Sequence, residues 1–169
     1  MLKLPDFKKS FRRNVTHALS ANVPAVIRMD CLDQLCNGID RRNRLFVEKL
    51  LTHVLTHDKN PVVRHEAAFT LGQLYTRGDI AGTESIHALC EKTQKDPALI
   101  VRHEAVETLG WYVFPEAMHT LKECRCDSNT EIVATARIAL ARFLSRRKSR
   151  HAVRRFKRAG RQKIRLLKI

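Results

Sequence analysis

One pattern recurs four times along the chain and constrains the fold more than any other feature. The segments VIRMDCLDQL, VVRHEAAFTL, IVRHEAVETL and EIVATARIAL align on Cys31, Ala67, Ala105 and Ala136, at intervals of 36, 38 and 31 residues. Each interval has room for two helices and two turns, the period of a helical solenoid. No stretch alternates convincingly between polar and apolar residues. The sequence therefore predicts an all-α fold, a short α-solenoid of about four helix pairs.

Helix-start signals locate the members of each pair. We expect the first helices at 5–19, 41–57, 82–94 and 115–125, and the second helices at 24–37, 61–76, 97–113 and 129–145. In three second helices a proline falls in the first turn, where a missing N–H has no consequence: Pro24, Pro61 and Pro97. Asn60 and Asp96 are placed as caps. Ser128 with Glu131 forms a capping box for the fourth second helix.

The positive charge of the chain lies mostly at its ends. The net charge is +15, yet residues 21–144 hold fifteen basic and sixteen acidic residues, whereas 145–169 hold twelve Lys and Arg and no acid. We therefore divide the chain into a repeat domain, 1–145, and a basic amphipathic tail, 146–169. Such a block indicates a polyanionic partner, namely nucleic acid, the ribosome or an anionic membrane, and the alternative is a solvated tail that aids solubility. The predicted nucleic-acid-binding residues are Arg146, Arg147, Lys148, Arg150, Arg154, Arg155, Lys157, Arg158, Arg161 and Lys163.

Cysteine usage and the start of the chain bear on its compartment. Five cysteines, an odd number, without a secretory apolar segment indicate a reducing compartment, the cytoplasm. Residues 1–19 are basic and amphipathic, so a mitochondrial transit peptide and the matrix are the alternative. No apolar run approaches the roughly 20 residues of a transmembrane helix. Cys124 and Cys126 are too few ligands for a zinc site.

Two of the four segments contain a His–Glu pair, His65–Glu66 and His103–Glu104. Packed helices lie about 8–10 Å apart, so imidazoles at equivalent positions of neighbouring helices can reach one ion. With Glu104 added, the set is two histidines and one carboxylate, which suits ferrous iron that must also bind oxygen. Glu66 is then left to orient a ligand or to receive the positive charge of a substrate.

The same pairs have a purely structural interpretation. Tandem duplication copies any residue, and an exposed His–Glu pair can simply be solvated. Arg64 and Arg102 are copied as well, and we expect them to form hydrogen bonds between repeats. The flanking segments, however, have Met29-Asp30 and Ala134-Thr135 at the corresponding positions. Since these repeats do without the pair, folding does not require it, and this favours metal binding.

Other motifs are weaker. Gly72 and Gly110 follow the two histidines by seven residues, and they either keep space open above the pairs or let neighbouring helices pack closely. His53 and His57 have a spacing that can bind metal, but their place near a helix end favours capping of the last carbonyls. The sequence has no nucleophile elbow, phosphate loop or dinucleotide fingerprint, which argues against those enzyme classes.

The stretches RHEAAFTLGQL and VRHEAVETLGWY resemble the HEAT-type repeats of deoxyhypusine hydroxylase. The resemblance covers about residues 41–113, and a weaker one connects the helical frame with the HEAT-like repeats of phycobilin lyases. In deoxyhypusine hydroxylase, His–Glu pairs hold a non-haem di-iron centre that activates oxygen to hydroxylate a modified lysine on a translation factor. The resemblance implies that His65, His103 and Glu104 are ligands of one iron and that Glu66 lies beside the substrate amine.

The sequence departs from that family in the number of pairs. The family has four His–Glu pairs in one chain and this sequence has two, so we expect a homodimer with a di-iron centre across its axis. The sequence then predicts a metal-binding HEAT-repeat protein, an iron-dependent monooxygenase whose protein substrate lies on the concave face. The alternative is a non-catalytic interaction module that binds a protein on its concave face and RNA or the ribosome through its basic ends.

Overall fold

The computed structural model describes residues 8–78 and 82–166, with side chains described as far as Ser149. Every element in the described part of the chain is helical, which confirms the predicted all-α fold. The elements are α1 (Lys9–Leu19), α2 (Ala25–Asn37), α3 (Arg44–His57), α4 (Pro61–Arg77), α5 (Thr83–Lys95), α6 (Leu99–Leu109), α7 (Pro115–Glu123), the 3₁₀ turn η1 (Cys124–Cys126) and α8 (Thr130–Leu166).

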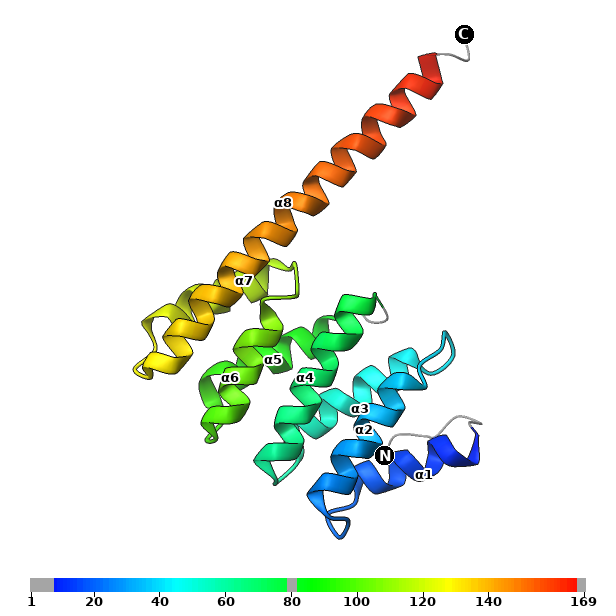
Figure 1. Ribbon diagram of the computed structural model, residues 1–169, viewed down its shortest axis with the longest axis vertical. Helices are drawn as coiled ribbons and strands as arrows, with labels where there is room; N and C mark the ends of the chain where they lie inside the picture. The colour runs from blue at the N-terminus through cyan, green and yellow to red at the C-terminus, as the bar shows by residue number, and fades with distance from the viewer. Residues whose placement is uncertain (1–7, 79–81, 167–169) are drawn as a thin grey trace.

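The helices stack as antiparallel pairs in two layers (Figure 1). The second helices α2, α4, α6 and α8 pack side by side in chain order. The first helices α3, α5 and α7 form the other layer, and α1 packs against α2. The predicted solenoid of four helix pairs is thus confirmed. We call the side of α2, α4, α6 and α8 that faces away from the first helices the second-helix face.

The residues on which the four segments align belong to the core. Cys31, Ala67, Ala105 and Ala136 are 4%, 0%, 0% and 0% exposed. Small side chains at these positions let the helices of the stack approach closely, because there is no long side chain to hold them apart. The repeat period in the sequence therefore corresponds to a repeat of buried, close-packed positions.

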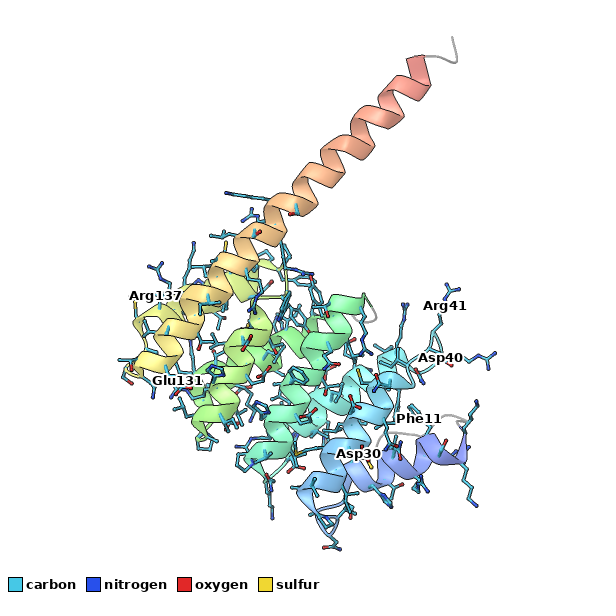
Figure 2. All side chains as sticks on the ribbon, in the orientation of Figure 1. Phe11, Asp30, Asp40, Arg41, Glu131 and Arg137 are labelled. Carbon is cyan, nitrogen blue, oxygen red and sulfur yellow. The ribbon has the colours of Figure 1, made fainter. Side chains whose placement is uncertain are left out.

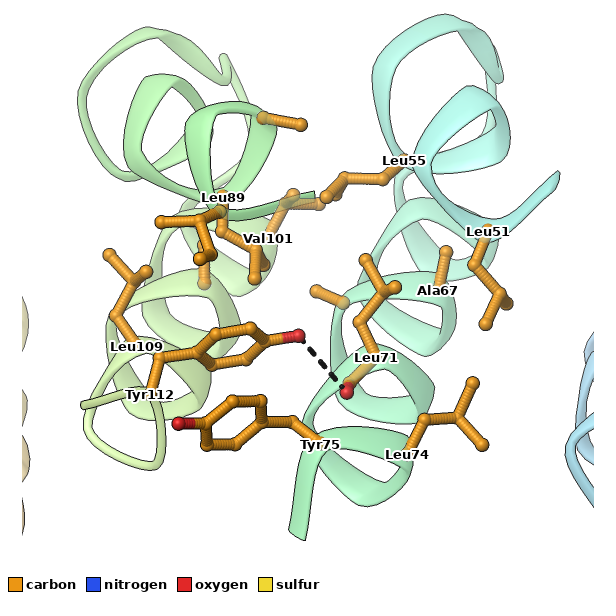
Figure 3. Close-up of a cluster of buried hydrophobic side chains, with 14 of the residues drawn as sticks. Leu51, Leu55, Ala67, Leu71, Leu74, Tyr75, Leu89, Val101, Leu109 and Tyr112 are labelled. Carbon is orange, nitrogen blue, oxygen red and sulfur yellow. Dashed lines mark hydrogen bonds between the residues drawn. The ribbon is translucent and has the colours of Figure 1, made fainter. Parts of the chain in front are cut away.

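Aromatic side chains close the core between the second and third pairs (Figure 3). The rings of Tyr75 and Tyr112 are stacked with their centroids 4.0 Å apart. The Tyr112 hydroxyl donates a hydrogen bond to the carbonyl oxygen of Leu71, 3.2 Å away. The Tyr75 hydroxyl accepts one from the Val113 amide at 3.0 Å. Both polar ends are thereby satisfied inside an apolar cluster.

Local capping chemistry explains where the second helices begin, and it corrects two predictions. The predicted cap of α4 is confirmed, because Asn60 Oδ1 accepts a hydrogen bond from the Val62 amide at 2.9 Å. Helix α6 begins at Leu99 instead of 97, so Pro97 lies before its first turn and Ala98, not Asp96, is its N-cap residue. Asp96 Oδ1 instead accepts from the Ala98 amide and forms a turn before the helix. The Ser128 capping box is wrong. Asn129 caps α8 by accepting from the amides of residues 131 and 132.

The largest other differences from the sequence-based ranges concern α6, α8 and α1. Helix α6 ends at Leu109, not at 113, where Gly110 packs directly against the backbone of α8. Helix α8 runs without a break through the expected boundary at 145/146 and through Gly160 to Leu166. Its last part extends away from the stack as a single helix (Figure 1). Helix α1 begins at Lys9, and the expected helical residues 5–7 lie outside the described residues.

A ladder of ion pairs joins each second helix to the start of the next. In each case an arginine binds the aspartate that precedes the following second helix, and the pairs of this Arg–Asp ladder are Arg28–Asp58, Arg64–Asp96 and Arg102–Asp127. Arg64 donates two hydrogen bonds to Asp96, at 2.7 and 2.8 Å. The predicted hydrogen bonds of Arg64 and Arg102 between repeats are therefore confirmed. Fork-to-carboxylate geometry of this kind fixes both distance and orientation.

Two further predictions can be compared with the structure. In the described residues, no helix combines the length and the apolar character needed to cross a bilayer. All five cysteines lie in the described part of the chain and all are free thiols, with Cys126 exposed and Cys124 buried.

Candidate metal centre

The two predicted His–Glu pairs lie next to each other on the second-helix face. His65 and Glu66 belong to α4, and His103 and Glu104 belong to the neighbouring helix α6. His65 reaches across to α6, where its Nε2 lies 3.3 Å from Oε2 of Glu104. The side chains of these two residues are 27% and 11% exposed. The repeat register therefore brings an imidazole and a carboxylate from different repeats into direct contact.

A third acidic residue joins this group. The ligand atoms of His103, Glu104 and Glu107 all lie within 4.8 Å of one another, and His65 joins them through Glu104. We call these four residues, His65, His103, Glu104 and Glu107, the His–Glu cluster. Glu107 was missed at the sequence level, although it follows His103 by four residues and such residues share one side of a helix.

The charges of the cluster perturb its titration. The hydrogen bond with Glu104 raises the pKa of His65, although burial opposes this, and the negative charges of Glu104 and Glu66 contribute. Burial raises the pKa of Glu66, His65 lowers it, and the carboxylates of Asp33 and Glu104 raise it further. Glu66 and Glu104 therefore surround the His65 imidazole with negative charge, and Asp33 of α2 adds to the charge around Glu66. A cation, either a proton or a metal ion, relieves their repulsion.

Packing beneath the cluster orients Glu104. The Thr108 hydroxyl lies 3.3 Å from Glu104 Oε1 and 3.1 Å from the carbonyl oxygen of Ala68 on α4. Gly72 allows this approach, because a Cβ atom there would lie 3.0 Å from Thr108 Oγ1. At Gly110 a Cβ would lie 2.8 Å from Cα of Ala139. Close helix packing thus accounts for both glycines, and Gly72 in addition borders an open cleft.

That cleft adjoins the cluster and has a volume of about 350 Å³. Glu104 and Glu107 line one part of it, Phe69 and Trp111 supply aromatic walls, and Arg146 contributes from α8. Phe69 is 43% exposed, so part of this apolar surface faces solvent. The arrangement is typical of a binding site, with a few polar groups in a partly apolar hollow.

Helix α8 supplies cations next to the cluster. Arg142 Nη2 lies 3.4 Å from Oε1 of Glu107. The guanidinium carbon of Arg142 lies 4.3 Å from the centroid of the Trp111 ring, and that of Arg146 lies 5.1 Å from it. Both arginines therefore contact the single tryptophan of the chain through cation–π geometry.

The donor atoms fit a divalent transition metal. Imidazole nitrogen together with carboxylate oxygen suits iron, manganese and zinc. The group whose ligand atoms lie within 4.8 Å of one another has one histidine and two carboxylates, whereas the predicted ligand His65 lies outside that group and contacts Glu104. The Thr108 hydroxyl provides the outer support that metal-bound carboxylates usually have. The set contains no thiolate, which would have favoured a closed structural zinc site.

The other predicted sites have different surroundings. The rings of His53 and His57 are stacked at 4.5 Å, and His57 Nδ1 lies 3.1 Å from the His53 carbonyl oxygen, in agreement with the predicted capping role. Of the predicted nucleic-acid-binding residues, only Arg146, Arg147 and Lys148 have described side chains. Arg147 Nη1 contacts the sulfur of Met118 at 3.7 Å. The remaining ones, from Arg150 to Lys163, lie outside the described side chains.

Comparison with known proteins supports the architecture. The family model for HEAT repeats matches residues 47–157, about two thirds of the chain. The chain belongs to the HEAT-repeat family. This match covers α4, α6, the part of α8 up to residue 157, and all members of the His–Glu cluster. The HEAT repeats predicted from the sequence are thereby confirmed.

The predicted resemblance to deoxyhypusine hydroxylase is confirmed as well. The HEAT-repeat protein is 33% identical over 86 residues to deoxyhypusine hydroxylase of Gallus gallus, and 32% identical over 86 residues to that of Homo sapiens. Each alignment covers 51% of this chain and 27% of the relative. Deoxyhypusine hydroxylase-B of Oryza sativa is 30% identical over 83 residues, 49% of this chain and 26% of the relative. The alignments thus span about a quarter of the length of these relatives.

A solved structure has the same fold. The structure of human deoxyhypusine hydroxylase in complex with glycerol superposes with a TM-score of 0.67 at 21% sequence identity. The superposition covers 83% of this chain and 46% of that chain. The stacked helix pairs described above are therefore the shared feature of the two proteins.

Proposed function

We propose that this HEAT-repeat protein binds iron through His65, His103 and Glu104 and acts as an oxygen-dependent hydroxylase on a protein substrate. One observation supports this above all others. His65 contacts Glu104 across two helices, at 3.3 Å, so ligands from both His–Glu pairs converge. The similarity to proteins named deoxyhypusine hydroxylase supports the choice of chemistry.

Each residue of the site has a role that follows from its surroundings. The two imidazoles would bind the metal in their neutral form. In the metal-free protein Glu104 favours the protonated form of His65, so metal binding would release that proton. Glu104, buried and oriented by Thr108, would balance the metal charge. Glu66 would receive the cationic group of the substrate. Bound iron would supply oxygen activation, and Phe69 and Trp111 would form the apolar walls of the neighbouring cleft.

We further propose that two chains face each other to complete a di-iron centre. The chain has two His–Glu pairs, and a two-fold axis would add two more from the partner. The second-helix face has exposed apolar side chains around the cluster, with Val62 40%, Phe69 43% and Ile100 46% exposed. Burial of such side chains is what a dimer interface requires. The cytoplasm is the compartment we propose, with the mitochondrial matrix as the alternative.

Metal analysis tests the proposal directly. The protein is expressed aerobically with iron, purified without a polyhistidine tag, and its metal content and mass in solution are measured. We expect stoichiometric iron and a dimer, with iron lost in His65→Ala and His103→Ala. Met29→Ala is the matched control, because Met29 has the register of these histidines in a repeat without the pair. An iron-free monomer that is fully folded would contradict the proposal.

A second candidate function is supported by helix α8. This helix continues for 21 residues beyond Ser145, and residues 145–169 contain twelve Lys and Arg. We propose that this segment binds RNA, alone or together with the ribosome, and that the protein serves as an interaction module. Removal of residues 150–169 should abolish retention on an RNA column at low salt, and the intact protein should lose affinity steeply as salt rises. Unchanged retention after the removal would contradict this function.

A further inference from the structure

We propose that Glu107 is an additional ligand of the cation and that Arg142 is a built-in competitor, which occupies Glu107 when the cation is absent. The inference rests on the proposed function only in that a divalent cation binds the His–Glu cluster. It adds a ligand supplied by the same chain and a connection between the metal centre and helix α8.

The position of Glu107 supports its role as a ligand. Its carboxylate belongs to the group whose ligand atoms lie within 4.8 Å of one another, together with His103 and Glu104. His103 and Glu107 are four residues apart on α6, so both face the same side of the helix. The Glu107 side chain is 41% exposed, whereas that of Glu104 is 11% exposed and contacts His65. Glu107 is therefore the carboxylate of the cluster that has room to move onto a cation.

Arg142 is the group that such a movement displaces. Its Nη2 lies 3.4 Å from Glu107 Oε1 and its Nη1 lies 3.4 Å from the Glu107 carbonyl oxygen. These distances are at the long end of hydrogen-bond geometry, and a partly exposed ion pair of this kind is weak. A divalent ion next to the same carboxylate exerts a stronger attraction, because it has twice the charge and binds at a shorter distance.

Trp111 lies next to Arg142, so its fluorescence should change when Arg142 leaves Glu107. The Arg142 guanidinium lies over Trp111, 4.3 Å from the ring centroid, and Arg146 lies one helical turn further along α8. Both residues lie in the part of α8 from which the helix extends beyond the stack. Cation binding at Glu107 therefore changes the charge that surrounds Trp111, and it weakens one tether between α6 and α8.

Titration of the full chain with Zn²⁺ tests the proposal, with calorimetry measuring the affinity and Trp111 fluorescence measuring the change near Arg142. Zn²⁺ is chosen because it is diamagnetic and therefore does not quench fluorescence as a paramagnetic ion does. We expect Glu107→Gln to weaken zinc binding by about tenfold. Arg142→Gln should strengthen it by about threefold, and the double variant should bind like Glu107→Gln alone, because the competitor then has no target. Zinc should change Trp111 emission in the unmodified protein and change it less in Arg142→Gln.

Control variants separate the alternatives. Arg137 is exposed on α8 (Figure 2), and Arg137→Gln removes the same charge without affecting Glu107. Two results would contradict competition between Arg142 and zinc for Glu107. One is an equal gain in zinc affinity in Arg137→Gln, and the other is a gain from Arg142→Gln in a protein that already has Glu107→Gln. Wild-type affinity in Glu107→Gln, with binding lost in His103→Ala, would overturn the role of Glu107 and leave the proposed function intact. Absence of zinc binding by the unmodified protein would overturn both.

Discussion

The central and outer second helices share one register but differ in what they place on the second-helix face. Helices α4 and α6 place His65–Glu66 and His103–Glu104 there, whereas α2 and α8 have Met29-Asp30 and Ala134-Thr135. All four helices bury a small residue at the same point of the repeat. The stack therefore forms with or without a His–Glu pair, so the repeat fold does not require one. Figure 2 marks Asp30 on α2, the acidic residue in the register of Glu66 and Glu104.

The Arg–Asp ladder shows the opposite distribution. An arginine occupies the same register in α2, α4 and α6, and each binds the aspartate that precedes the next second helix. In α8, the last second helix of the stack, Val133 occupies this register. The arginine is thus present wherever a further repeat follows. The comparison separates residues that connect repeats from residues that are free to serve a ligand.

The largest effect should come from breaking the ladder. Asp96 has a fully buried side chain that accepts two hydrogen bonds from Arg64. We expect Asp96→Asn to lower the free energy of unfolding by about 3 kcal/mol, because a buried guanidinium loses its counter-charge. His103→Ala should lower it by less than about 1 kcal/mol. Urea denaturation measures both, and equal losses would mean that the His–Glu pair is as structural as the ladder.

The pH dependence of this difference has a defined sign. Burial alone would raise the pKa of Asp96, but hydrogen bonds from Arg64 and the Ala98 amide outweigh it and lower the pKa. The carboxylate therefore contributes its full stabilisation above the ordinary aspartate pKa of about 3.9, and this is lost as the pH falls through the lower pKa of the folded state. The gap between the unmodified protein and Asp96→Asn should accordingly narrow below about pH 4.

The next largest effect should distinguish the central from the outer helices through metal binding. A cation at one hundred times its dissociation constant stabilises a folded protein by about 2.7 kcal/mol. We expect this stabilisation by ferrous ion under anaerobic conditions to be lost in Glu104→Ala and retained in Asp30→Ala. The two residues share one register, so the pair of variants is closely matched. Thermal unfolding with and without the ion gives the measurement, and loss of the shift in Asp30→Ala would contradict a site confined to the central helices.

The sequence Thr-Leu-Gly ends both His–Glu segments, at residues 70–72 and 108–110, and its two glycines should differ in how well they tolerate substitution by alanine. A Cβ at Gly110 would lie 2.8 Å from backbone Cα of Ala139, which cannot move without shifting α8. We expect Gly110→Ala to lower the free energy of unfolding by roughly 2 kcal/mol through overpacking. Gly72→Ala should be milder, since its Cβ would meet the Thr108 hydroxyl at 3.0 Å. Equal losses in chemical denaturation would mean that the two junctions pack alike.

The smallest effect concerns His65 in the metal-free protein. Its hydrogen bond with Glu104 raises its pKa above the ordinary histidine value of about 6.5. The pair therefore stabilises the fold fully below about pH 6.5, and this contribution disappears as the pH rises through the pKa of the folded state. His65→Gln should cost about 0.5 kcal/mol at pH 5.5 and almost nothing at pH 8. A larger loss at pH 8 than at pH 5.5 would contradict the assignment.

Sequence reasoning predicted the stack well because its signals are local and repeated. The period of small buried residues marks the second helices, and Asn60 with Pro61 marks the start of α4 through backbone geometry alone. Seven of the eight α-helices in the described residues therefore begin within about three residues of the expected position. The cap of α8 was missed locally, because Asn129 and not the neighbouring Ser128 accepts from the first amides of the helix. The end of α6 was missed for a tertiary reason. Gly110 stops α6 because α8 lies against it, and no local pattern contains that contact.

The sequence predicted only those residues of the candidate site that belong to the duplicated motif. His65, His103 and Glu104 attracted notice because the motif is duplicated. Glu107 did not, since its counterpart in the other copy is Phe69. The contact of Arg142 with Glu107 and Trp111 joins residues more than 30 positions apart on α6 and α8, and only the packing of these helices reveals it.

The length of α8 has a consequence for simultaneous occupancy. From residue 146 to residue 166 the helix advances about 30 Å, at 1.5 Å per residue. A large polyanion held near the far end would sit well outside the hollow between α4 and α6, and its bulk would not obstruct entry to that hollow. The proposed binding of a polyanion and the proposed chemistry would therefore not compete for space on one chain, because this length of helix separates them.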